Sequence, residues 1–80
     1  MPTVLRKNGF QVIIWTHDHL PIHVHIFKGD GELIVNLGND KADISIRENY
    51  GMRSSDLRQA LRLVAQNYSF LLEKWREIHG

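Results

Sequence analysis

The sequence predicts an α+β domain, in which an antiparallel β-meander of four to five strands is covered on one face by a C-terminal helix. Three observations lead to this fold class. Short runs of β-branched and aromatic residues alternate with glycine-containing turns over residues 1–47. After Gly51 the apolar residues change to helical spacing, which predicts a helix over residues 54–79. The 80 residues suit one domain, so residues 1–80 are expected to fold together.

The hydrophobic runs and the turn residues between them place the first four strands. Asn8-Gly9 suits a type I′ hairpin turn, because both positions adopt positive φ readily. Pro21 keeps the preceding residue extended and marks a loop. Gly29-Asp30-Gly31 predicts a second hairpin turn. Strands are therefore expected at residues 3–7, 10–15, 23–28 and 33–37.

A fifth strand is expected at residues 42–47, because Ala42, Ile44 and Ile46 alternate with polar residues. These short connections between successive strands favour an antiparallel meander.

The C-terminal helix carries one apolar stripe with alternating steps of four and three residues. Ser54 or Ser55 is expected to cap its N-terminus, with Asp56 in the first turn. A straight helix of this length would measure about 36 Å, whereas the sheet should span only about 20 Å. The helix is therefore expected either to kink near Asn67 or to reach past the sheet to a partner, such as a second copy of the chain.

Composition narrows the class of protein. The chain has no cysteine, which excludes disulfides, thiolate metal sites and a cysteine nucleophile. Ten basic and nine acidic residues leave a net charge of +1, so no strong field favours nucleic acid. No apolar run is long enough to span a membrane, and the N-terminus does not resemble a secretion signal. We expect a complete, cytoplasmic chain that does not enter a membrane.

The chemically unusual feature is a group of four histidines within residues 17–25. In a strand, His23 and His25 lie on one face about 6.5–7 Å apart, while Val24 and Ile26 lie on the other face and suit the core. The histidine face is therefore expected either to point away from the helix or to lie at the rim of the sheet. His19 lies on the loop before the strand, where it can approach the strand pair.

Three chemistries suit this group. The first is a metal site in which His19, His23 and His25 bind zinc, nickel or copper, with Asp18 completing or orienting the ligands. Imidazole is the commonest transition-metal ligand, and a His-x-His pair on a strand is a good bidentate platform.

The second is acid–base catalysis on RNA, with His23 and His25 as the proton-transfer pair and Asp18 orienting them. Arg58 and Arg62, four residues apart on the helix, would then bind phosphate. The third is structural, with the histidines hydrogen-bonded and chemically inert. The sequence alone leaves open whether the protein is an enzyme.

The motif Asp18-His19-Leu20-Pro21-Ile22-His23-Val24-His25, together with the opening Met1-Pro2-Thr3 and the ending Leu72-Glu73-Lys74-Trp75-Arg76-Glu77-Ile78, resembles a family of short bacterial and archaeal proteins. This DUF4160-like family has the signature Asp-His-x-Pro-Pro-His-x-His and no assigned function. Ile22 stands where the family commonly has a second proline, and His17 lies outside the signature. The resemblance implies a role like that of a toxin–antitoxin component, with a small antitoxin-like protein as partner.

Overall fold

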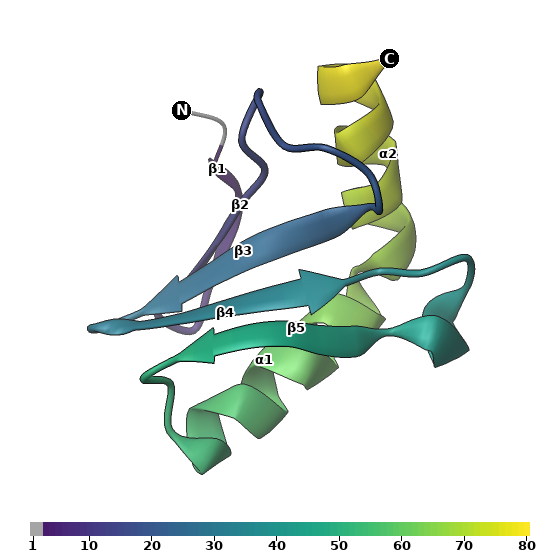
Figure 1. Cartoon of the computed structure of the whole chain (residues 1–80). Helices are drawn as coiled ribbons and strands as arrows, with labels where there is room; N and C mark the ends of the chain where they lie inside the picture. Colours follow the sequence, from purple (N-terminus) through teal and green to yellow (C-terminus); the bar gives the residue numbers. More distant parts are fainter. Residues whose placement is uncertain (1–2) are drawn as a thin grey trace.

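The computed structural model describes residues 3–80 and shows an antiparallel five-stranded sheet followed by two helices (Figure 1). The strands are neighbours in chain order, which confirms the α+β meander. They are β1 (Thr3–Lys7), β2 (Phe10–Ile13), β3 (His23–Lys28), β4 (Gly31–Asn36) and β5 (Ser45–Tyr50).

The first hairpin turns as its sequence predicts. Asn8 and Gly9 both have positive φ, at 53° and 83°, between the antiparallel strands β1 and β2. A long loop, residues 14–22, then connects β2 to β3. This β2–β3 loop carries the first half of the histidine segment.

The expected strand at residues 42–47 is shifted toward the C-terminus, so the meander runs to residue 50 rather than 47. Lys41–Asp43 form one turn of 3-10 helix, η1, before β5 begins. The Asp40 side chain accepts a hydrogen bond from the Ala42 backbone N–H at 2.7 Å. Such local capping competes with strand pairing, which explains why the alternation at Ala42 does not give a strand.

A β-bulge interrupts the pairing of β4 with β5. Ile34 pairs with Glu48 and Val35 pairs with Ile46, so Arg47 is the extra residue. Bulges bend a strand and change the direction of a side chain. Here the Arg47 guanidinium reaches the Asn36 side chain, at 3.0 Å, on the neighbouring strand.

The expected kink near Asn67 is confirmed as a break between α1 (Ser54–Gln66) and α2 (Tyr68–His79). Asn67 has φ −116° and ψ 21°, outside the helical range, and its side chain donates to the Leu63 carbonyl at 2.9 Å. The expected serine cap is absent among the described residues, because Arg53 precedes the first turn and makes no side-chain capping bond. No helix within residues 3–80 is long and apolar enough to cross a membrane.

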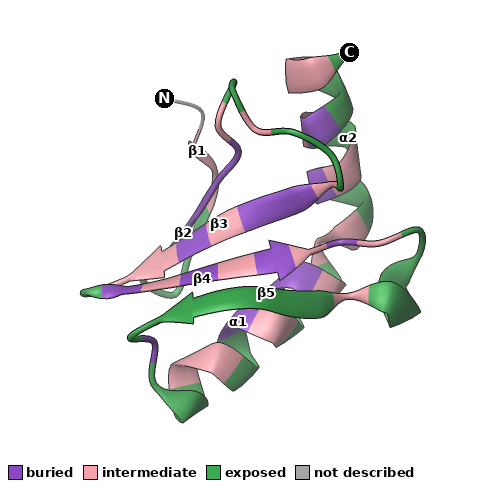
Figure 2. Ribbon diagram, in the orientation of Figure 1, coloured by how far each residue is buried: buried purple, intermediate pink, exposed green. Residues whose placement is uncertain are grey.

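One hydrophobic core joins the sheet to both helices (Figure 2). Alternate residues of β3 and β4 enter it, as the period of two requires. Its buried members are Phe10, Val12, Ile14, Val24, Ile26, Leu33, Val35, Leu37, Met52, Ala60, Leu63, Val64, Leu71 and Trp75. Val24 and Ile26 therefore hold β3 in the orientation that places His23 and His25 on its other face.

The histidine face is not wholly turned away from the helices. The His23 ring lies 5.5 Å from the ring of Trp75 on α2, and only 5% of His23 is exposed. After the break at Asn67, α2 passes the start of β3 and rises beside the β2–β3 loop (Figure 1). The end of the sheet that carries the histidines is thus enclosed by the loop and by α2.

Candidate metal site

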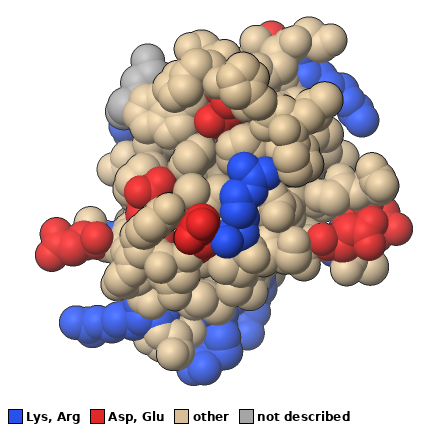
Figure 3. All heavy atoms as spheres, in the orientation of Figure 1, with Lys and Arg blue, Asp and Glu red and all other residues tan. Residues whose placement is uncertain are grey.

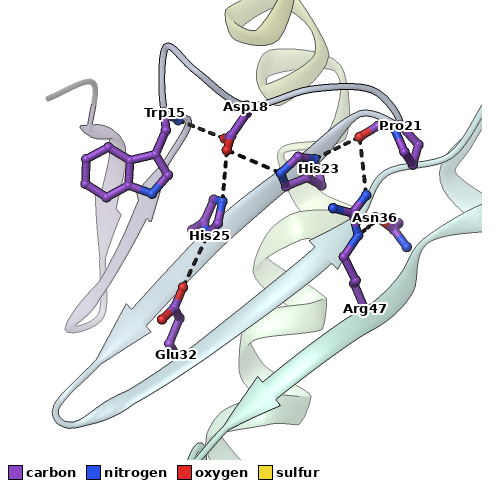
Figure 4. A network of polar contacts seen from close by, with 8 residues as sticks. All are labelled: Trp15, Asp18, Pro21, His23, His25, Glu32, Asn36 and Arg47. Carbon is purple, nitrogen blue, oxygen red and sulfur yellow. Dashed lines mark hydrogen bonds and ion pairs between the residues drawn. The ribbon is translucent and has the colours of Figure 1, made fainter.

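The site begins with Asp18, which a tight turn in the β2–β3 loop holds in place. The backbone N–H of Asp18 donates to the Trp15 carbonyl at 3.1 Å. In return, the Trp15 N–H donates to Oδ2 of Asp18 at 2.9 Å. These two bonds fix the carboxylate, and its other oxygen, Oδ1, points toward the first residues of β3 (Figure 4).

His23 and His25 direct the same ring atom at this oxygen. Nε2 of His23 lies 3.4 Å from Asp18 Oδ1, and Nε2 of His25 lies 3.3 Å from it. Asp18, His23 and His25 each offer one ligand atom, and all three atoms lie within 4.8 Å of one another. The three side chains are only 6–12% exposed, so little water reaches them.

The opposite ring nitrogens are held by hydrogen-bond acceptors. Nδ1 of His23 lies 2.8 Å from the Pro21 carbonyl oxygen, and Nδ1 of His25 lies 3.1 Å from Glu32 Oε2. A carbonyl oxygen can only accept, and so can an ionised carboxylate, so each Nδ1 carries the proton. In the neutral ring, Nε2 then presents a lone pair.

The contacts with Asp18 therefore bring acceptors together. The lone pairs on both Nε2 atoms face Asp18 Oδ1, which is itself an acceptor when ionised. Such a buried arrangement is costly unless a positive charge lies among the three atoms. A proton on one or both rings, or a metal ion, supplies that charge.

The spacing suits a metal ion. Four ligands around a tetrahedral zinc, with bonds of about 2.05 Å, lie about 3.3–3.4 Å from one another. The two Nε2–Oδ1 distances, 3.3 and 3.4 Å, match this separation. Protonated imidazoles would instead bring two positive rings within 5.3 Å of each other in a largely buried site.

Aromatic side chains enclose the two histidines. The Trp15 ring meets His25 edge-on with centroids 6.4 Å apart, and the Trp75 ring lies next to His23. Trp15 and Trp75 are the two tryptophans of the chain. Each one therefore contacts a different candidate ligand.

The other residues proposed from the sequence lie elsewhere. His19 is exposed and lines a cleft beside Asp18, outside the group of three ligand atoms. His17 is also exposed and stacks on Trp15. Arg58 and Arg62 are exposed on α1, and α1 lies at the opposite end of the molecule from the β2–β3 loop (Figure 1). In Figure 3 basic side chains gather at that α1 end.

Two residues of the network were not assigned to it from the sequence. Glu32 could have been placed there, because the core face of β4 leaves Glu32 on the face that His25 shares. Arg47 could not, because its position depends on the bulge. Its guanidinium lies 3.5 Å from the Pro21 carbonyl, which also accepts from His23.

Comparison with known proteins agrees with the resemblance drawn from the sequence. A family model described as "Domain of unknown function (DUF4160)" matches residues 9–76. That range contains Asp18, His23, His25 and the residues that hydrogen-bond to them. The chain matches no curated protein and no solved structure.

Proposed function

The chain belongs to the DUF4160 family, and we propose that it binds a divalent transition metal ion through Asp18, His23 and His25. One observation carries the proposal: both Nε2 atoms face the same carboxylate oxygen while both Nδ1 atoms are held by acceptors. A metal ion placed among these three atoms replaces two unfavourable contacts between acceptors with three metal–ligand bonds.

The surroundings of the ligands support the proposal. Metal-binding histidines usually donate their second ring N–H to a carbonyl or a carboxylate, which fixes the ring and raises its basicity. Pro21 and Glu32 supply one acceptor of each kind. Arg47 in turn contacts the Pro21 carbonyl and ties β5 to the site.

Two nitrogen ligands and one oxygen ligand favour zinc, nickel or copper over magnesium or calcium, which prefer oxygen. Zinc is the first candidate, because the Nε2–Oδ1 spacing fits a tetrahedron. Three protein ligands leave a coordination position for water or a substrate, which is the pattern of catalytic zinc sites. There a metal ion activates bound water or polarises a substrate oxygen.

Metal-free proton transfer to RNA has less support. The paired histidines are largely buried, and the expected phosphate-binding residues Arg58 and Arg62 lie on α1 at the other end of the molecule. The toxin-like action and the antitoxin-like partner stay predictions from the resemblance. They are tested by growth arrest on expression, which should disappear in a His23→Ala/His25→Ala variant.

Calorimetric titration of the metal-free protein with zinc, nickel and copper tests the proposal. We expect one ion per chain, and quenching of tryptophan fluorescence by copper, because each tryptophan contacts a ligand. Binding should be lost in His23→Ala/His25→Ala. It should persist in the matched control His17→Ala/His19→Ala, which also removes two imidazoles.

The outcomes separate the ligand sets. Absence of stoichiometric binding in the native chain would overturn the proposal, and so would binding that survives removal of His23 and His25. Loss of binding in His17→Ala/His19→Ala would instead make His19 a ligand, as the sequence predicts. Circular dichroism of each variant establishes whether it is folded.

A further inference from the structure

A cleft lies between the β2–β3 loop and the last turn of α2, directly beside the candidate metal site. Its volume is about 600 Å³, within the usual range for small-molecule pockets. It is lined mainly by Asp18, His19, Leu20, Trp75, Arg76 and His79. Asp18 is therefore both a candidate metal ligand and part of the cleft wall.

The polar groups of this cleft suit an anion. Arg76 is exposed and forms no ion pair within residues 3–80. Nε2 of His79 is buried and has no hydrogen-bond partner among the described residues. Among these side chains, the Asp18 carboxylate accepts from the Trp15 N–H through Oδ2, and its Oδ1 faces the proposed metal position.

The apolar groups suit a flat or hydrophobic body. The His79 ring packs on Trp75 with centroids 4.0 Å apart, so the two rings form one aromatic wall. Leu20, which is 76% exposed, stands on the other side of the cleft. A few polar groups beside aromatic side chains are the combination that ligand pockets commonly show.

We propose that this cleft binds a small molecule that carries a carboxylate or phosphate on an apolar body, next to the open position of the metal ion. The contact between this molecule and the metal ion depends on the metal site proposed above. Arg76 provides charge-assisted, two-pronged hydrogen bonds to the anionic group. The C-terminal end of α2 opposes an anion by about fivefold in affinity at an exposed position. The Arg76 bonds contribute about tenfold or more.

Benzoate and phenyl phosphate are suitable probes, and benzamide is the neutral control. Each is titrated into ¹⁵N-labelled full-length protein, both metal-free and zinc-loaded, while the two tryptophan indole N–H signals are followed by NMR. We expect the anions to shift the Trp75 indole signal, with tighter binding in the zinc-loaded form. Trp15 is not part of the cleft wall and should respond less.

Arg76→Gln should weaken binding of both anions about tenfold. Arg6→Gln, which removes an exposed arginine on β1, should leave it unchanged. The inference is overturned if neither anion shifts the Trp75 signal, if benzamide binds as tightly, or if Arg76→Gln binds as the native chain does. If the protein binds the anions but not zinc, only the metal proposal is wrong. If it binds zinc but not the anions, only the proposal of an anion-binding cleft is wrong.

Discussion

The substitution Asp18→Asn should change the stability of the metal-free and the zinc-bound protein in opposite directions. Oδ2 of Asp18 accepts from the Trp15 N–H, whereas Oδ1 faces the two imidazole nitrogens. Asparagine keeps an oxygen for Trp15 and turns its NH₂ group toward His23 and His25. Two contacts between acceptors therefore become contacts between a donor and an acceptor.

The magnitudes follow from this geometry. In the metal-free protein, one net hydrogen bond should raise the free energy of unfolding by about 0.5–1.5 kcal/mol. Zinc at about 100 times its Kd should stabilise the native chain by about 2.7 kcal/mol, which is roughly 10–20 °C in Tm for a domain of this size. If the loss of the Asp18 carboxylate weakens zinc about 100-fold, the same zinc concentration stabilises the variant by only about 0.4 kcal/mol.

Urea and thermal unfolding near pH 8, with EDTA or with zinc, measure both effects. Asp30→Asn, at an exposed position in the turn between β3 and β4, is the control and should change neither quantity. The reasoning is refuted if metal-free Asp18→Asn loses more than about 1 kcal/mol, or if zinc stabilises it as much as the native chain.

Three further substitutions test single features. Glu32→Gln keeps an acceptor for the His25 imidazole but removes the charge, so calorimetry should show zinc affinity about tenfold lower. Glu48→Gln, at an exposed position, is the control. If Glu32→Gln binds zinc as tightly as the native chain, Glu32 is not part of the site. Gly38→Ala should lower the free energy of unfolding by at least about 2 kcal/mol, because φ is +70° and the new Cβ would overlap a neighbouring aspartate. Gly29→Ala, with φ +56° and open space, should cost about half as much in the same urea titration, and equal losses would contradict the steric argument. Burial, and then two nearby carboxylates, raise the pKa of the Tyr68 phenol above its ordinary value of 10.0. The stability that the neutral phenol contributes is therefore lost as pH rises above that value, and Tyr68→Phe should show a flatter alkaline fall in unfolding free energy.

Residue preferences and the periods of strands and helices predict the turns, the helix break and the faces of the strands. The type I′ turn at Asn8 and the break at Asn67 follow from residue preferences and from the length of the helix. The shared face of His23 and His25 follows from the strand period of two. The strand period of β4 also predicts which face Glu32 occupies. Placing Glu32 next to His25 requires, in addition, the register of the β3–β4 hairpin.

Features that depend on tertiary packing were not predictable in the same way. The bulge in β5 changes the direction of the Arg47 side chain, and no sequence pattern near Arg47 indicates this bulge. The contact between His23 and Trp75 arises because α2 passes the start of β3 after the break at Asn67. The choice of Asp18 over His19 as the neighbour of the strand pair depends on the turn at Trp15, which only the folded loop defines.

The number of ligands distinguishes two roles for a metal ion in so small a domain. A chain of 80 residues without cysteine gains from any link between its elements, and the site connects the β2–β3 loop to β3. A purely structural zinc, however, usually has four protein ligands. Here the described residues offer three, and the cleft beside Asp18 is lined by the His79 ring and by Arg76, which has no ion pair among those residues. An incomplete ligand set next to such a cleft favours a site that binds and activates a small molecule over one that only stabilises the fold.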